Sequence, residues 1–224
     1  MLAKVVHGTM DTARVDDAAR AVREEFVPNF SAQPGALRGY WMADRLSGQI
    51  LIVTTWSDAD ALDAARSSDG AQRARIADGI GLRVHSIQSM VVVAQRDEVE
   101  VRPEWRWARA TWITGDPVGA AVLPASHRLI VPDQARSAGF KGSYWLADES
   151  ISCGVALSFW DGPDALTGSE AASRRRRRRL QRQFGFSIDR IHHYDGIGAT
   201  APAAIDLTAP DDTSPVDLRL VSSD

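Results

Sequence analysis

Three polar residues stand two positions apart near the end of the chain, at Arg190, His192 and Tyr194. Because successive side chains of a β-strand point to opposite faces, these three share one face of the strand predicted over 187–195. A guanidinium, an imidazole and a phenol on one face could bind an anion or a phenol, and the imidazole could accept its proton. We therefore expect His192 to be catalytic, and Arg190 and Tyr194 to bind substrate.

Two other segments with strand-like alternation, 3–10 and 107–114, carry polar residues of the same kind. His7 lies in the first segment, and Arg109 and Thr111 lie in the second, where Thr111 corresponds to His7. We expect His7 to act as a catalytic base, and Arg109 and Thr111 to bind substrate, all facing one cavity shared with the polar strand described above. The alternative is that these residues form a hydrogen-bonded or solvated rim at the strand ends.

The sequence contains no pattern that is typical of a metal site or a cofactor site. His192 and His193 are adjacent, so on a strand they point to opposite faces and cannot hold one metal together. Cys153 is the single cysteine, and no Cys/His cluster has the spacing of a zinc site. A phosphate-binding glycine loop, a dinucleotide fingerprint and a Ser-His-Asp arrangement are also missing. We expect neither a metal nor a cofactor.

An unbroken run of six arginines, Arg174 to Arg179, falls where a helix is expected. Consecutive residues on a helix point all round it, so the run cannot form one directed stripe, and no aromatic residues are interleaved with it. We interpret the run as a solvated helix surface. With a net charge of −3, the chain is not expected to bind nucleic acid.

The composition is that of an ordinary globular protein, with 44% apolar and 25% charged residues. No apolar run approaches the roughly 18 residues of a membrane-spanning helix, and the first residues do not resemble a signal peptide. We therefore expect a cytoplasmic protein with no membrane partner.

The chain repeats itself at an offset of 104 residues. The matches include Pro28 with Pro132, Gly35 with Gly139, Tyr40-Trp41 with Tyr144-Trp145, and Trp56 with Trp160. Since Trp is rare, two Trp coincidences in a gapless register indicate an internal duplication. The matched aromatics are expected to pack in the core and on the sheets; the alternative is that some of them stack on an aromatic ligand.

Each copy predicts the order β-α-β-β-α-β of a ferredoxin-like domain, with its first helix closing before Pro28 or Pro132. The predicted division is repeat 1 over 1–96, a linker over 97–104, repeat 2 over 105–197, and an acidic tail containing Pro, Ser and Thr over 198–224. A four-stranded sheet with helices on one face leaves its other face bare. We therefore expect an α+β fold in which the two repeats pack sheet to sheet as an intrachain barrel. The chain would then be a pseudo-dimeric monomer or a homodimer of such monomers.

The stretch PGALRGYWMAD, a strand ending in Trp56, and the stretch SDADALDAARSS resemble the antibiotic-biosynthesis-monooxygenase domain of the dimeric α+β barrel superfamily. The resemblance covers roughly 1–95 and 105–197. It implies activities such as cofactor-free oxidation of polycyclic aromatics or haem degradation, although many such domains have no demonstrated chemistry.

The haem-degrading branch of that family uses an Asn on its first strand, near the position of His7 here. It also uses a Trp and a His on its second helix. The corresponding residues here are Ala64 and Ala74 in the first copy, and Gly168 and Arg178 in the second. We therefore expect no haem degradation.

Two hypotheses about function follow. The first is a small-molecule-binding, cofactor-independent monooxygenase-like protein that acts on an aromatic or polyketide-like substrate between the repeats. The second is a non-catalytic barrel that binds a ligand or a partner. The second copy carries more Arg and His on its predicted pocket face, which favours functional asymmetry.

Overall fold

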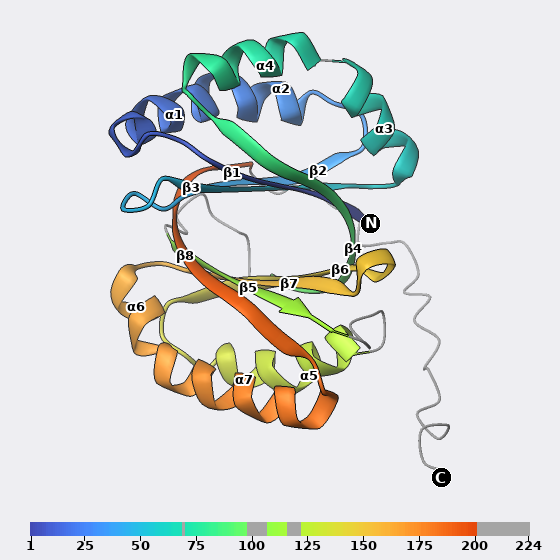
Figure 1. The fold of residues 1–224 in the computed structure, drawn as a ribbon, viewed down its shortest axis with the longest axis vertical. Helices are drawn as coiled ribbons and strands as arrows, with labels where there is room; N and C mark the ends of the chain where they lie inside the picture. The colour runs from blue at the N-terminus through green and yellow to red at the C-terminus, as the bar shows by residue number, and fades with distance from the viewer. Residues whose placement is uncertain (69, 98–106, 116–121, 201–224) are drawn as a thin grey trace.

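Eight antiparallel strands form one closed barrel in the order β1-β3-β2-β8-β5-β7-β6-β4 (Figure 1). The computed structural model describes residues 1–68, 70–97, 107–115 and 122–200. The strands are β1 (Leu2–Thr9), β2 (Ala36–Ala43), β3 (Gln49–Trp56), β4 (Arg83–Asp97), β5 (Trp107–Thr114), β6 (Phe140–Asp148), β7 (Cys153–Trp160) and β8 (Ser187–Ala199). The two halves thus contribute four strands each, in the same order along the chain.

The two longest strands, β4 and β8, close the barrel because each belongs to both halves. The first part of β4 pairs with β1 and its last part with β6, so that Val91 lies opposite both Leu2 and Ala147. β8 joins β5 to β2 in the same way. Figure 1 shows these two strands running between the two layers on opposite sides of the molecule. The expected intrachain α+β barrel is confirmed.

Helices cover the outside of the barrel on two opposite faces (Figure 1). The first half supplies α1 (Val15–Ala21), a π turn (Val22–Phe26), α2 (Val27–Ser31), α3 (Ala59–Ser68) and α4 (Gly70–Gly79). The second half supplies α5 (Val122–Gln134), α6 (Pro163–Gly168) and α7 (Glu170–Phe184); short 3-10 turns occupy Thr12–Arg14 and Glu149–Ile151. Within the described residues, no helix combines the length and apolar character that crossing a bilayer requires.

The prediction that each first helix closes before its proline is wrong. In the first half, the π turn precedes α2 and places Pro28 in the first turn of that helix, where a missing N–H is tolerated. In the second half, α5 runs through Pro132 and ends at Gln134.

Aromatic side chains fill the centre of the barrel. Tyr40 stacks on Phe159 with a distance of 4.7 Å between ring centroids, and Tyr144 lies 5.4 Å from Tyr40. All three side chains are almost fully buried. An eight-stranded barrel is just wide enough for side chains to fill its interior, and here they do so at its middle.

Under the helices of the second half, His127 on α5 packs edge-on against Trp145, with ring centroids 5.9 Å apart. Burial, helped by the charges of Arg96 and Arg128, lowers the pKa of His127 to about 4. Its Nε2 is buried and has no hydrogen-bond partner among the described residues. The folded protein therefore holds His127 in its neutral form.

This burial predicts acid sensitivity above the range in which carboxylates titrate. The unfolded chain takes up a proton on His127 near pH 6.5, whereas the folded chain does so only near pH 4, so the free energy of unfolding should fall as the pH drops between these values. Urea denaturation at a series of pH values measures this slope. The His127→Phe variant should flatten the slope between pH 6.5 and 4.5; an unchanged slope would contradict the prediction.

Candidate functional site

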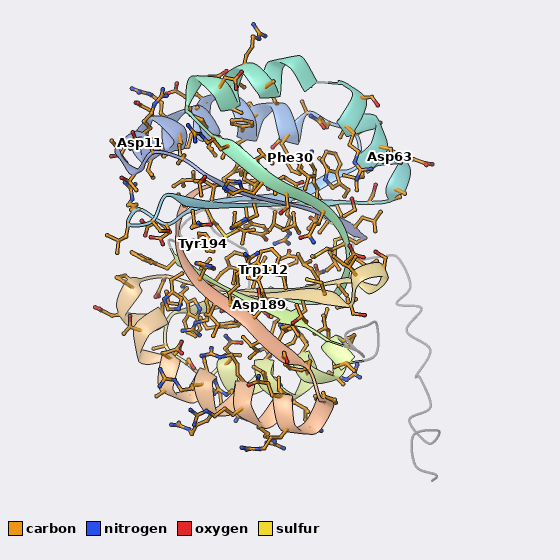
Figure 2. All side chains as sticks on the ribbon, viewed as in Figure 1. Asp11, Phe30, Asp63, Trp112, Asp189 and Tyr194 are labelled. Atoms are coloured by element: carbon orange, nitrogen blue, oxygen red, sulfur yellow. The ribbon has the colours of Figure 1, made fainter. Side chains whose placement is uncertain are left out.

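The inner face of the barrel holds one group of polar residues at the end of β1. The ring of His7 lies 6.2 Å from that of Trp112 across the interior, and the Arg190 guanidinium lies 4.4 Å from the centre of the Trp112 ring. Tyr194 is fully buried on the same face of β8, with the ring of His192 6.0 Å from its own. The structure thus brings together His7, Arg190, His192 and Tyr194 on the inner face. Figure 2 labels Trp112 and Tyr194 in the space between the two sheets.

Four buried atoms of this group have no hydrogen-bond partner in the part of the chain that the structure describes: His7 Nε2, Trp112 Nε1, Arg190 Nε and Tyr194 Oη. Burial, followed by the charge of Arg190, lowers the pKa of His7. The side chain of Gln49 offsets part of this shift, although its Oε1 makes no hydrogen bond of normal geometry. Burial raises the pKa of Tyr194. At neutral pH, His7 is therefore a neutral, weak base and Tyr194 a neutral phenol.

The two first strands of the halves are offset by 105 residues and not by 104. His7 pairs with Leu51, whereas Trp112 pairs with Val155, which stands 104 positions after Leu51. The counterpart of His7 is therefore Trp112. Because a shift of one residue turns every side chain of a strand to its other face, the residues beside Trp112 point away from the barrel interior.

The expectation that Arg109 and Thr111 face the same cavity as His7 is therefore wrong. Both residues are buried on the outer face of β5, beneath the helices of the second half. The roles predicted for these two residues, and for His7 and the polar face of β8, stay predictions. The structure corrects only the location of Arg109 and Thr111: a ligand that contacts them would lie on the outer face of β5 and not inside the barrel.

Arg109 is held by protein groups at every nitrogen of its guanidinium. Nη1 donates to Ser173 Oγ (2.9 Å). Nη2 donates to the Leu166 carbonyl (2.8 Å) and to Ser169 Oγ (2.9 Å). Nε donates to His193 Nε2 at 3.3 Å. These contacts tie β5 to the junction between α6 and α7.

The charge of Arg109 is paired with Glu170, whose Oε2 lies 3.1 Å from Nη2. Burial lowers the pKa of Arg109 to about 10, a shift that Glu170 opposes and Arg177 reinforces. Burial alone would raise the pKa of Glu170, but the hydrogen bond from Arg177 and the charge of Arg109 outweigh it, so that this pKa is lowered. Both groups are therefore ionised at neutral pH.

A pocket of about 50 Å³, called here the second pocket, lies between the outer face of this sheet and helices α5 and α7. Its polar lining includes Arg109, Thr111, Gln134, Ser173, Arg176 and Arg177. Its apolar lining includes Ile113, Ile130, Trp145, Leu180 and Phe186. Two of the six clustered arginines thus turn toward the sheet. The interpretation of the whole run as solvated is therefore too simple, although Arg174, Arg175, Arg178 and Arg179 are exposed.

The equivalent pocket of the first half, called here the first pocket, has a volume of about 110 Å³. It lies between the outer face of the first sheet and helices α2 and α4. Aromatic side chains form its walls, and the Phe30 ring meets Trp56 at 5.1 Å and Trp41 at 5.8 Å, edge-on in both cases. Figure 2 shows Phe30 between the sheet and the helices. Lys4, the counterpart of Arg109 at the offset of 105, is among the polar lining residues, with Asn29, Gln33 and Thr54.

The sequence favoured packing for these tryptophans, with stacking on an aromatic ligand as the alternative, and it did not identify the first pocket. A usable signal was present, since Tyr40 and Trp41 are adjacent on a strand and must face opposite sides. Tyr40 fills the barrel, and Trp41 consequently faces the helices.

The structure also bears on haem and metal binding. Ala64, Ala74, Gly168 and Arg178 are all exposed, and no histidine is among the described residues that line the two pockets. The expectation of no haem degradation stays a prediction. Among the described residues, no group of three or more His, Cys, Asp or Glu side chains could hold a metal ion.

The contacts of Arg109 predict that this residue stabilises the folded protein. Replacing Arg109 with Met leaves Glu170 with Arg177 as its partner, but it removes the hydrogen bonds to Ser173, Ser169 and the Leu166 carbonyl, and a buried polar group left without a partner costs about 1–3 kcal/mol. Arg136→Met, which breaks an exposed ion pair with Asp133, should cost less than about 1 kcal/mol. Urea denaturation compares the two variants. Equal losses would show that the Arg109 network does not stabilise the fold.

Comparison with known proteins gives a fold. No family model and no curated protein sequence matches the chain. Among solved structures, an anthrone oxidase-like protein matches with a TM-score of 0.64 and 15% identity, over 89% of this chain and 92% of that one. A monooxygenase assigned by similarity in Fusobacterium nucleatum matches with a TM-score of 0.63 and 13% identity, over 90% and 92%.

A third structure is a ferredoxin-fold protein from Listeria monocytogenes, described as related to antibiotic biosynthesis monooxygenases. It matches with a TM-score of 0.51 and 8% identity, over 87% of this chain and 94% of that one. Because these alignments span most of each chain, the likeness extends over both halves of the barrel. The chain therefore has the fold of the antibiotic-biosynthesis-monooxygenase-like α+β barrels.

Proposed function

We propose that this chain is a monooxygenase-like protein that binds an aromatic small molecule in the first pocket. The observation that carries the proposal is the wall of Phe26, Phe30, Trp41 and Trp56 around that pocket. Small-molecule sites are concave, largely apolar and aromatic, with a few polar groups that orient the ligand. The first pocket has this composition.

The aromatic walls favour a flat ligand. Phe30 meets both tryptophans edge-on, so a planar ring that enters the pocket meets aromatic side chains on its walls. The volume of about 110 Å³ is below the roughly 150 Å³ of an apolar cavity that admits benzene. A single ring therefore enters with a small movement of the lining side chains, and further rings extend toward the solvent opening.

The polar lining favours a ligand with phenol, enol or carbonyl oxygens. Asn29 and Gln33 offer amide groups, and the ammonium of Lys4 favours the deprotonated form of a phenol or enol bound beside it. Such an anion is the electron-rich form that can react with dioxygen. With anthrone, the overall reaction consumes one O₂ and yields anthraquinone and one water.

One observation favours the second function, binding without catalysis. The described residues that line the first pocket include no His, Asp, Glu or Cys, so among them the side chain that could accept a substrate proton is Lys4 in its neutral form. The polar inner face around His7 belongs to the barrel interior and lies on the other side of the sheet.

Binding can be tested with a matched pair of substitutions. Ile76→Trp fills the first pocket, whereas Leu180→Trp fills the second pocket at the position 104 residues further along. With 1-naphthol as the probe, calorimetric titration should give one site per chain. The dissociation constant should rise about tenfold or more in the first variant and stay within about twofold in the second. Equal weakening in both variants would sink the assignment to the first pocket.

Catalysis can be tested with anthrone in air. Oxygen uptake and anthraquinone absorbance should exceed the spontaneous rate in buffer, and Lys4→Met should lower kcat about tenfold or more if Lys4 stabilises the anion. If 1-naphthol binds but the protein adds nothing to the spontaneous rate, oxygenation of this class of compound is excluded, and the binding function stands.

A further inference from the structure

The second pocket differs from the first in charge as well as in size. Three guanidinium groups line it, those of Arg109, Arg176 and Arg177. The carboxylate paired with them in the described part of the chain is that of Glu170, which contacts Arg109 and Arg177. Three positive charges therefore face one negative charge at a half-buried site.

Arg176 is the arginine of this group whose guanidinium has a buried nitrogen, Nη1, without a hydrogen-bond partner among the described residues. A buried N–H without a partner costs the full desolvation of that group, and more when the group is charged. A carboxylate is the ligand whose geometry best matches a guanidinium, because its two oxygens accept two parallel hydrogen bonds.

The rest of the second pocket is apolar, and this restricts the anion. Trp145, Leu180 and Phe186 line the pocket beside the arginines. An inorganic anion would leave these walls unused, whereas an organic acid can place its carbon chain against them. The volume of about 50 Å³ is roughly a third of the cavity that admits benzene, so the chain of carbons must be short and contain no ring.

We propose that the second pocket is a binding site for a short-chain aliphatic carboxylate, with the carboxylate on Arg176 and the carbon chain against Trp145 and Leu180. Arg177 and Arg109, both already paired with Glu170, add attraction through their charge. The site is separate from the one proposed for aromatic ligands, since the two pockets lie under different helix layers on opposite faces of the barrel (Figure 1).

The sequence of the first half indicates that this site belongs to the second half alone. At the offset of 104 residues, Arg176 corresponds to Gln72 and Glu170 to Arg66. The residue that would take the carboxylate is therefore neutral in the first half. The two halves can therefore be compared within one chain, because the guanidinium of Arg176 has no counterpart at Gln72 in the first half.

A titration with sodium propionate, at ionic strength held constant with sodium chloride, tests the proposal. Two-dimensional ¹H–¹⁵N NMR spectra follow the backbone amides of β5, α5 and α7. We expect saturable shifts at one site. Arg176→Gln should weaken binding about tenfold or more, and Arg178→Gln, which removes one exposed charge from the same helix, should change it less than about twofold.

Two further arms make each outcome decisive. Arg176→Lys keeps the charge but loses the pair of parallel N–H groups of the guanidinium, so it should bind propionate more weakly than the wild type. This variant keeps the test decisive even if Arg176→Gln does not fold. Inorganic phosphate should bind more weakly than propionate, because it gains nothing from the apolar walls. Shifts that do not saturate, equal weakening by the two glutamine variants, or phosphate binding as tight as propionate binding would overturn the proposal.

Discussion

Hydrogen bonding along β4 and β8 ties the two halves of this chain together. Each of these strands pairs with a strand of its own half and continues into the sheet of the other half. Neither sheet therefore has a free edge, and the eight strands share one inner face. Tyr40, Tyr144 and Phe159 fill the middle of that face. Both pockets described here consequently lie outside the barrel, between each sheet and its own helices.

The same constraint explains which part of the fold the sequence could predict. The tryptophan and tyrosine matches at the offset of 104 residues predict the duplication, and alternation along the strands predicts the order of elements. Both follow from local periodicity. The offset of 104 could not give the register of the first strands, because the first half has one more residue than the second half between its first strand and the matched window. Two identities, Ala3 with Ala108 and Thr9 with Thr114, were the signal for an offset of 105.

This single residue decides the environment of every side chain on β5. With the wrong offset, Arg109 faces the barrel beside His7; with the right one, it faces the helices and meets Ser169, Ser173 and Glu170. Strand periodicity is sensitive to such a shift because its period is two. Helix periodicity could not predict which arginines of α7 face the sheet. Only the rotation of α7 about its axis shows that Arg176 and Arg177 turn inward, and that rotation depends on tertiary packing that the sequence does not display.

Because one chain supplies both halves, this barrel has a freedom that two identical subunits lack. A symmetric dimer must present the same residue in both of its pockets. Here Lys4 stands in the first pocket where Arg109 stands in the second. The longer, forked side chain reaches the junction of α6 and α7 and fixes it, and the second pocket is about half the volume of the first, 50 against 110 Å³. The two pockets therefore differ in both volume and charge. Yet the strands that carry them keep one common barrel, since each half still packs Tyr40 or Tyr144 inward and Trp41 or Trp145 outward.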